Sequence, residues 1–340
     1  EKANDDITST NLFIQRAMAF MMPMMSLVSS GLSVAVYLIG ATIIKAASVG
    51  TPAHSPRINL FSDMVVFTSY GMQVVMAFMM LTMIFIMFPR ANVSAGRINE
   101  VIDTASSIKN GTKDGSVAQE VGTVEFKNVY FQYADASEHV LEGVSFKANK
   151  GETVAFIGST GSGKSTILNL IARLIDPTNG SVTIDGTDIR QISQYDLHEK
   201  VSFTQQKAQL FSGTVRSNLQ FGKSDATDEE MWQALEIAQA ADFVREQGGL
   251  ELAVEQNGAN FSGGQKQRIS IARTLIKEAE IYLFDDSFSA LDFATDRQLR
   301  TAINHSEKHK NKIKVIVAQR IATVMSADQI LVLENGIAVG

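Results

Sequence analysis

The sequence is marked first by what it lacks: it has no cysteine, one tryptophan and five prolines in 340 residues. Without cysteine the chain can have no disulfide framework, no thiol nucleophile and no cysteine-liganded metal centre. It also lacks a basic surplus, because 36 acidic residues against 30 lysines and arginines leave a net charge of −6 at pH 7. A nucleic-acid-binding protein would favour a basic surface, so this composition argues against a nucleic-acid partner.

Charged side chains are missing altogether from two long stretches near the N-terminus, residues 17–44 and 64–89. Each stretch exceeds the roughly 20 apolar residues that span a bilayer as a helix. Both are too long for a cleaved signal peptide. The segment between them, Lys45–Asp63, contains Gly50 and two prolines, which favour a short loop. We therefore predict two membrane spans, with the lipid bilayer as a partner.

Methionines are concentrated in the same two stretches, which hold most of the fourteen in the chain. Methionine adapts to irregular apolar surfaces, so these residues suit a pocket for apolar cargo. Packing against lipid or neighbouring helices is the commoner use and is the favoured interpretation for most of them. Because neither stretch contains Asp, Glu, Lys or Arg, the spans offer no candidate for an ion relay.

The second stretch is followed by a segment with helical periodicity. Apolar residues recur at helical intervals from Pro89 to Asp103, so the helix is expected to leave the bilayer and continue. Residues 106–122 carry glycines and alternating charges and are predicted to be a linker. The chain thus divides into a membrane part at 1–105, this linker and a second domain at 123–340.

A glycine-rich run in the second domain indicates a phosphate-binding loop. Residues 158–166 fit the pattern Gly-x4-Gly-Lys-Ser/Thr, with an apolar strand-like run before them and a helix-like run after them. Backbone amides and the helix N-terminus meet the phosphate charge in such a loop. Lys164 should reach the outer phosphates, and Ser165 should bind magnesium. The predicted nucleotide-binding residues here are Gly158, Ser159, Thr160, Gly161, Ser162, Gly163, Lys164, Ser165 and Thr166.

A second motif lies further along the chain. Phe261-Ser-Gly-Gly-Gln265, followed by Ile269-Ser-Ile-Ala-Arg273, resembles the signature of ATP-binding cassette (ABC) proteins. Leucine is usual in the family where Phe261 stands, an exchange of one apolar residue for another. In that family the signature closes over ATP held by the P-loop of a second cassette. The resemblance therefore implies a second ABC half-transporter as partner, whose nucleotide would be met by Ser262, Gly263, Gly264 and Gln265.

The resemblance assigns further positions. Tyr133 matches the aromatic residue that stacks on adenine, although a core tyrosine would fit the same pattern. Gln206 matches the glutamine that touches magnesium; its neighbour Gln205 makes this an assignment by spacing. Asp285 would hold magnesium through water. Asp292 ends a Ser-Ala-Leu-Asp run like the loop that crosses to the partner's P-loop. The cofactors implied are ATP and Mg²⁺.

Two residues depart from the family pattern. Asp286 stands where hydrolysis uses glutamate, so its carboxylate lies roughly 1 Å further back, and such a misplacement can cost on the order of 10²-fold in rate. Gln319 stands where a histidine is expected; it can donate a hydrogen bond but cannot take a proton at neutral pH. With P-loop and signature intact, this pattern resembles the degenerate half of a heterodimeric ABC exporter.

Two alternatives stay open. One is a homodimeric exporter of lipid or peptide with two working sites, in which Asp286 is slow but active. The other is a regulatory ATP-binding subunit without turnover, for which the intact signature would have no use. The resemblance implies outward transport of apolar or amphipathic compounds, as in multidrug export. It also implies a multi-pass protein of the plasma membrane with its nucleotide-binding domain in the cytoplasm.

The expected fold is an α/β P-loop NTPase of the ABC type preceded by an all-α transmembrane segment of two spans, which would match the fifth and sixth of the six in a family half. The last residues resemble a hairpin with an Asn-Gly turn, so we expect a short C-terminal piece to be missing. Strands are predicted at 124–131, 153–157, 181–185, 281–285, 314–318 and 329–334. Helices of this domain are predicted at 164–175, 228–241, 264–276 and 293–304.

Overall fold

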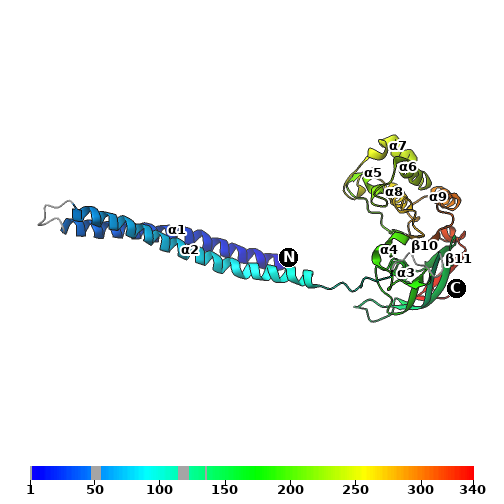
Figure 1. Cartoon of the computed structure of the whole chain (residues 1–340), viewed down its shortest axis with the longest axis horizontal. Helices are drawn as coiled ribbons and strands as arrows, with labels where there is room; N and C mark the ends of the chain where they lie inside the picture. Colours follow the sequence, from blue (N-terminus) through cyan, green and yellow to red (C-terminus); the bar gives the residue numbers. More distant parts are fainter. Residues whose placement is uncertain (1, 47–54, 114–121, 135) are drawn as a thin grey trace. The chain divides into compact units, whose positions relative to one another are not determined.

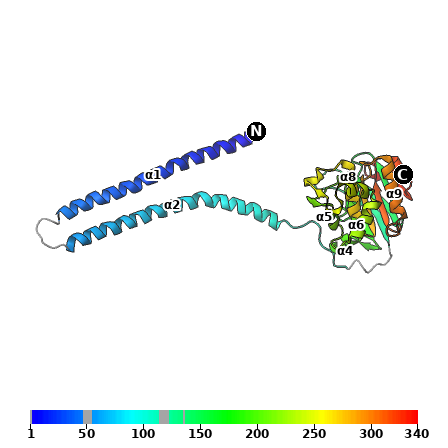
Figure 2. The same ribbon diagram turned by 90° about the horizontal axis from the view of Figure 1, so that it is seen from above.

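The computed structural model describes residues 2–46, 55–113, 122–134 and 136–340. The chain divides into two compact units, Glu1–Ala105 and Ser106–Gly340. The first unit is a pair of long antiparallel helices, α1 (Lys2–Ala46) and α2 (Ser55–Asp103); Figure 2 shows that they separate toward the start of α1 (Figures 1 and 2). Each helix contains an 18-residue window apolar enough to cross a membrane, with mean hydropathy of 2.0 in α1 and 2.1 in α2.

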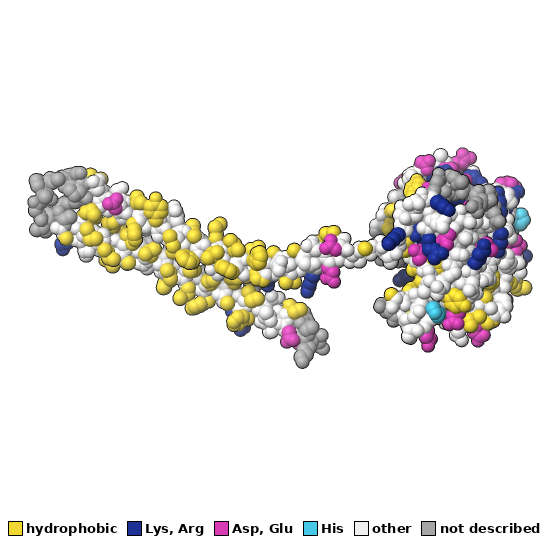
Figure 3. All heavy atoms as spheres, turned by 60° about the horizontal axis from the view of Figure 1, so that its bottom comes forward, with side chains coloured by type: hydrophobic (Ala, Val, Ile, Leu, Met, Phe, Trp, Pro, Cys, Tyr) yellow, Lys and Arg dark blue, Asp and Glu magenta, His cyan; other side chains and the backbone are white. Residues whose placement is uncertain are grey.

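Small residues let the two helices approach closely. Gly40 is buried, and a Cβ atom added there would overlap the side chain of Met64. A Cβ atom on Gly71 would likewise come 2.8 Å from the Leu32 side chain. Close approach at small residues is a common device of membrane helices, where lipid is as apolar as the side chains. The outward faces of α1 and α2 are dominated by exposed apolar side chains (Figure 3).

The prediction of a loop at Lys45–Asp63 is wrong at both ends. Helix α1 continues to Ala46, and α2 already begins at Ser55. Pro56 falls in the first turn of α2, where a helix tolerates proline because no hydrogen bond from that nitrogen is needed. The remaining residues of the predicted loop, 47–54, lie outside the described residues. At its other end α2 passes Pro89 and continues to Asp103, as its apolar spacing indicates.

The second unit contains two main sheets. The larger has the strand order β12-β11-β3-β10-β9-β6 and is parallel except for the edge strand β12. The smaller is antiparallel, with the order β2-β1-β4-β5, and a short pair, β7-β8, stands apart. The strands are β1 (Thr123–Phe131), β2 (Leu141–Asn149), β3 (Thr153–Gly158), β4 (Asn179–Ile184), β5 (Thr187–Asp188), β6 (Val201–Thr204), β7 (Gly213–Thr214), β8 (Ala253–Val254), β9 (Ile281–Asp285), β10 (Ile313–Val317), β11 (Gln329–Glu334) and β12 (Ile337–Ala338).

The helices of this unit fall into two groups. Helices α5 to α8 gather on one side, apart from the sheets, in Figure 1. One apolar core joins these helices to one face of the large sheet, and a second core fills the space between the two sheets around α3. The helices are α3 (Lys164–Ile171), α4 (Gln194–Lys200), α5 (Val215–Gln220), α6 (Asp228–Ile237), α7 (Ala241–Gln247), α8 (Gly263–Leu275), α9 (Phe293–His305) and α10 (Ile321–Val324), with short 3-10 turns at Gly249–Glu251 and Gln256–Gly258.

Two predicted helices of this unit have the wrong extent. The helix predicted at 164–175 ends at Ile171, because Arg173 adopts a left-handed backbone with φ of 50°. The helix predicted at 228–241 is divided into α6 and α7 by Gln239, whose φ is 57°. A left-handed residue cannot continue a right-handed helix. Sequence reasoning also missed strand β2 and the short strands β5, β6, β7 and β8, whereas the expected hairpin at the Asn-Gly turn is formed by β11 and β12.

One buried polar pair gives the second unit a pH-sensitive stability. Tyr282 of β9 and His309 are both buried, and a hydrogen bond of 2.8 Å joins the Tyr282 hydroxyl to His309 Nδ1. Burial lowers the pKa of His309 from 6.5 to about 4 and raises the pKa of Tyr282. The folded chain therefore keeps His309 neutral at pH values at which the unfolded chain has already taken up a proton.

We predict a loss of stability between pH 6.5 and pH 4 that depends on His309. Above pH 6.5 the residue is neutral in both states, and below pH 4 it is protonated in both. Between them the free energy of unfolding should fall by up to about 1.4 kcal/mol per pH unit. Urea unfolding of the full chain, followed by the fluorescence of its one tryptophan, Trp232, measures it. His309→Gln should flatten this part of the profile; an unchanged profile would contradict the assignment.

Candidate nucleotide-binding site

A cavity of about 360 Å³ opens where strands β3, β9 and β10 of the large sheet end. The carboxyl ends of parallel strands are the usual ligand-binding edge of an α/β sheet. Most of the predicted nucleotide and magnesium residues meet here, although the chain separates them widely. The cavity is lined by Tyr133, Val140, Thr160, Gly161, Gly163, Lys164, Ser165, Thr166, Gln206, Asp285, Asp286, Val317 and Gln319.

The glycine-rich loop wraps the end of the buried Lys164 side chain. Lys164 Nζ donates to the carbonyl oxygens of Gly158 at 2.9 Å and Ser159 at 2.5 Å, and it lies 3.4 Å from Ser162 Oγ. Gly161 has a φ of 86°, and a Cβ atom added there would meet nothing within 4 Å, so this side of the loop is open. The loop thus has the exposed backbone and the lysine that a phosphate group requires.

Burial and charge act against each other at Lys164. Loss of hydration lowers its pKa, while the negative charges of Asp286 and Asp285 act in the opposite direction. The pKa of Asp285 is shifted in the opposite direction, because burial and the neighbouring charge of Asp286 both raise it. The hydrogen bond from Ser165 and the charge of Lys164 partly offset that rise. A buried cation facing two buried carboxylates is an arrangement suited to a ligand that brings both phosphate and a counter-cation.

The residues at the end of β9 fit a magnesium ion. Ser165 Oγ donates to Asp285 Oδ1 at 2.9 Å, so a hydroxyl and a carboxylate already lie together, and Gln206 lines the same cavity. Magnesium prefers oxygen ligands, takes only one or two carboxylates from a protein, and fills its other positions with water and phosphate. No group of three or more His, Asp or Glu residues that could hold a metal exists among the described residues. The donor set therefore fits magnesium held jointly with nucleotide.

Asp286 accepts hydrogen bonds from two amide side chains. Its Oδ2 atom lies 3.0 Å from Gln319 Nε2 and 3.3 Å from Gln206 Nε2. The carboxylate is 7% exposed, and its backbone is left-handed, with φ of 45°. Neither amide can accept a proton from this carboxylate or from a water molecule beside it at neutral pH. One oxygen of the Asp286 carboxylate is thus occupied by neutral donors.

The predicted adenine contact, Tyr133, also lines the cavity. Tyr133 is 46% exposed, which excludes the alternative of a core tyrosine, and its ring packs edge-on against buried Phe131 at 4.8 Å between centroids. About half of the Tyr133 side chain is thus open to solvent beside the cavity that it lines. Val140 and Val317 also line the cavity. Sequence reasoning missed both, because an isolated valine carries no signal that distinguishes an apolar binding surface from a core.

The signature residues lie outside this cavity. Ser262 is the N-cap of α8: its hydroxyl accepts from Gln265 N at 3.3 Å, and its own N donates to Gln265 Oε1 at 2.9 Å. Ser262 and Gly263 are exposed, and nothing lies within 4 Å of a Cβ atom built on Gly263. Asp292 is likewise the N-cap of α9, accepting from Ala294 N and Thr295 N. Ser262 and Asp292 thus mark the exposed starts of two helices, α8 and α9, and neither lines the P-loop cavity.

Comparison with known proteins agrees with this geometry. The sequence profile of the ABC transporter family matches residues 141–289. A solved structure of a bacterial Atm1-family ABC exporter with ATP bound superposes with a TM-score of 0.74 at 29% identity, covering 93% of this chain and 54% of that one. The chain carries an ABC cassette. The predicted fold class, a P-loop cassette preceded by two long apolar helices, is thereby confirmed, and the cassette implies ATP binding.

Several curated relatives align with this ABC protein. An ABC transporter ATP-binding protein of Mycobacterium tuberculosis is 37% identical over 343 residues, covering 100% of this chain and 57% of the relative. A similar protein of Bacillus subtilis is 35% identical over 337 residues, covering 98% and 56%. A putative multidrug export ATP-binding/permease protein of Bacillus subtilis is 44% identical over 216 residues, covering 63% and 37%. The chain therefore spans little more than half the length of the relatives that match it throughout.

We predict that Tyr133→Ala weakens ATP binding by roughly 5- to 150-fold, because stacking of a base on an aromatic ring is worth about 1–3 kcal/mol. Tyr133→Phe keeps the ring and should bind ATP as the unchanged protein does. Tyr195→Ala removes a tyrosine that is 76% exposed and does not line the cavity, so it serves as the matched control. Titration with a fluorescent ATP analogue measures all four proteins. Equal affinity in the Tyr133→Ala protein would exclude the stacking role.

Proposed function

We propose that this chain is part of the ATP-binding and permease subunit of an ABC exporter, and that this subunit forms half of a heterodimer. The two membrane-length helices joined to an ABC cassette support the permease role. The likeness to an exporter structure and to a putative multidrug export protein supports outward transport. Under this proposal the cassette lies in the cytoplasm, where ATP is available, and the helices are part of a multi-pass plasma-membrane domain.

The hydrogen bonds of Asp286 carry the second part of the proposal, that the chain's own P-loop site hydrolyses ATP slowly. Its carboxylate is one methylene shorter than the glutamate of the family, and its Oδ2 is occupied by Gln319 and Gln206. A base must reach the proton that it abstracts within about 2.6–3.2 Å, directly or through one water. A recessed carboxylate held between two amides meets this requirement poorly. Bound magnesium would neutralise phosphate charge, but it would not supply the missing base.

The signature would then serve the partner. Ser262 and the amides of Gly263 and Gly264 present hydrogen-bond donors at an exposed helix start, which suits the terminal phosphate of an ATP molecule held by another cassette. A Cβ atom on Gly264 would lie 3.3 Å from the carbonyl oxygen of Ala290, so the signature is adjacent to the Ser289–Asp292 run. Two motifs expected to face a partner are thus neighbours in the fold.

The proposed cargo is apolar or amphipathic. The helices offer an apolar groove of about 420 Å³, whose lining includes Met64, Phe67 and one charged residue, Asp63. A homodimer with two working sites that exports lipid or peptide is the main alternative. A purely regulatory ATP-binding subunit is the other, and the exposed signature argues against it, because such a role has no need of phosphate donors at that helix start.

We predict that two substitutions in the full-length protein, co-expressed with its partner, act very differently. Ser262→Arg should remove most ATPase and transport activity, because it blocks the donors that complete the competent site. Asp286→Ala should cost comparatively little, because the site it alters contributes little turnover. ATP hydrolysis and dye efflux in inverted vesicles measure both. Equal losses from the two substitutions would support two equivalent sites instead.

We further predict that restoring the family residues activates the slow site. Asp286→Glu with Gln319→His brings the carboxylate forward by roughly 1 Å and adds an ionisable partner, so hydrolysis at this site should rise by on the order of 10²-fold. The measurement is ATP turnover in a complex whose competent site has been disabled by the Ser262→Arg substitution. Gln319→His alone is the control and should give a smaller gain. If the double variant stays at background, the slow step lies elsewhere than in these two residues.

A further inference from the structure

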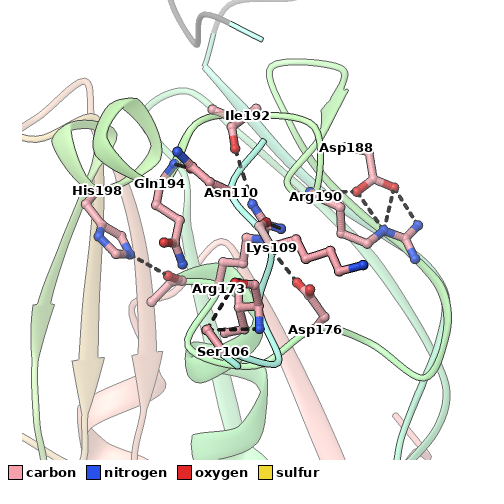
Figure 4. Close-up of polar contacts among 12 residues, drawn as sticks. Ser106, Lys109, Asn110, Arg173, Asp176, Asp188, Arg190, Ile192, Gln194 and His198 are labelled. Atoms are coloured by element: carbon pink, nitrogen blue, oxygen red, sulfur yellow. Dashed lines mark hydrogen bonds and ion pairs between the residues drawn. The ribbon is translucent and has the colours of Figure 1, made fainter. Parts of the chain in front are cut away.

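The linker that precedes the cassette is bound to it by Arg173, a residue that the nucleotide site does not use. Arg173 follows the P-loop helix α3 by two positions, is 2% exposed and has a left-handed backbone with φ of 50°. A buried guanidinium in a disfavoured backbone conformation is costly unless its contacts compensate. In Figure 4 its side chain lies between the linker on one side and the segment around Ile192 on the other.

Three hydrogen bonds satisfy the Arg173 guanidinium. Nη2 donates to the carbonyl oxygen of Lys109 at 2.6 Å, Nη1 donates to that of Ile192 at 3.2 Å, and Nε pairs with Asp176 Oδ1 at 3.0 Å (Figure 4). The planar fork of arginine can hold three acceptors in fixed directions, which the single ammonium of lysine cannot do. Arg173 thus joins the linker backbone, the end of the P-loop helix and the Ile192 segment.

The linker backbone also makes hydrogen bonds of its own to the segment around Ile192. Lys113 forms a parallel bridge with Ile192: Lys113 N donates to Gln191 O at 2.8 Å, and Ser193 N donates to Lys113 O at 3.0 Å. Asn110 Oδ1 accepts from Gln194 N at 2.8 Å. The contact is also close, because a Cβ atom on Gly111 would collide with the backbone of Gln191 and Ile192. Residues 109–113, which we call the linker strap, are therefore docked by specific bonds.

Docking shortens the connection to the membrane helix. Helix α2 ends at Asp103, so residues 104–108 alone join it to the strap, a reach of roughly 20 Å at most. After the strap, the next described bonds that tie this segment to the cassette are those of Gly122 and Thr123, whose amides donate to Asp185 Oδ1 at 2.7 and 3.1 Å. The docked strap therefore places a fixed point within six residues of the end of α2.

We propose that Arg173 is a positioning residue that fastens the linker strap to the end of the P-loop helix and so couples movement of α2 to the nucleotide site. Helix α3 suits this role because its apolar side chains are fully buried, so that it moves with the core rather than independently. The docking itself is independent of the proposed function, but its consequence for coupling rests on that function, since it needs a transport cycle to act on.

Two substitutions release the strap from opposite sides. Arg173→Met removes the guanidinium, and Gly111→Val forces the strap away while leaving every cassette side chain in place. Lys109→Ala is the matched control, because Arg173 donates to the Lys109 carbonyl oxygen and not to its side chain. Arg173→Lys keeps the charge without the fork and should give an intermediate result. If Arg173→Met fails to fold, Gly111→Val still tests the proposal.

Docking is measured first, in the full-length protein with its partner. The chain has no cysteine, so Thr112→Cys gives a single position in it for a nitroxide spin label on an exposed strap residue. The label should be immobilised in the parent and in Lys109→Ala, and mobile in Arg173→Met and Gly111→Val. Fluorescent ATP binding should be equal in all of them. A label that stays immobilised in Arg173→Met and Gly111→Val would overturn the proposal. The Arg173 hydrogen bonds and the close contact at Gly111 would then not be what holds the linker strap in place.

Coupling is measured second, as cargo transported per ATP hydrolysed in vesicles. Arg173→Met and Gly111→Val should lower this ratio by roughly fivefold or more, with Lys109→Ala unchanged. A released strap with an unchanged ratio would also overturn the proposal, because docking would then be passive. A parent complex that neither transports nor hydrolyses would refute the proposed function, while the spin-label result would still decide whether Arg173 holds the strap.

Discussion

The nucleotide site depends on one constraint, the parallel pairing of β3, β10 and β9 at the centre of the large sheet. This order brings the end of β3, where the P-loop begins, to the same edge as Asp285 and Asp286 at the end of β9. Gln319 follows β10 at that edge. Without this pairing, the lysine and the two carboxylates would be far apart, and their mutual effects on pKa would vanish.

The same helix that begins at the P-loop ends beside the linker. Lys164 opens α3 at the nucleotide cavity, and Arg173 follows its last turn at the linker strap. Both side chains are buried cations whose charge is balanced by carboxylates, Asp285 and Asp286 at one end and Asp176 at the other. Burial of a charge is tolerated only with such partners. One short helix thereby links the nucleotide cavity to the linker strap.

Much of the cassette could be predicted because its motifs are contiguous. The P-loop residues, the strand that ends at Asp285 and the turn at Asn335 and Gly336 are short segments whose spacing alone carries their meaning. The extents of 164–175 and 228–241 could not be predicted, since Arg173 and Gln239 adopt left-handed backbones that ordinary helix propensity does not reveal. Strand β6 could not be predicted either, for another reason: it has only four residues, and its place in the sheet depends on pairing with β9.

By itself the sequence determined the class of the fold, the two apolar helices and the identity of the residues that could meet a nucleotide, because these follow from local patterns of glycine, charge and hydropathy. Only the tertiary structure decided that Gln206, and not Gln205, lines the cavity. The same is true of the two amides that donate to Asp286 Oδ2 and of the hydrogen bond from Arg173 to the linker backbone. Each of those facts is a contact between segments remote in the chain, and no local pattern encodes which distant atom a side chain will meet.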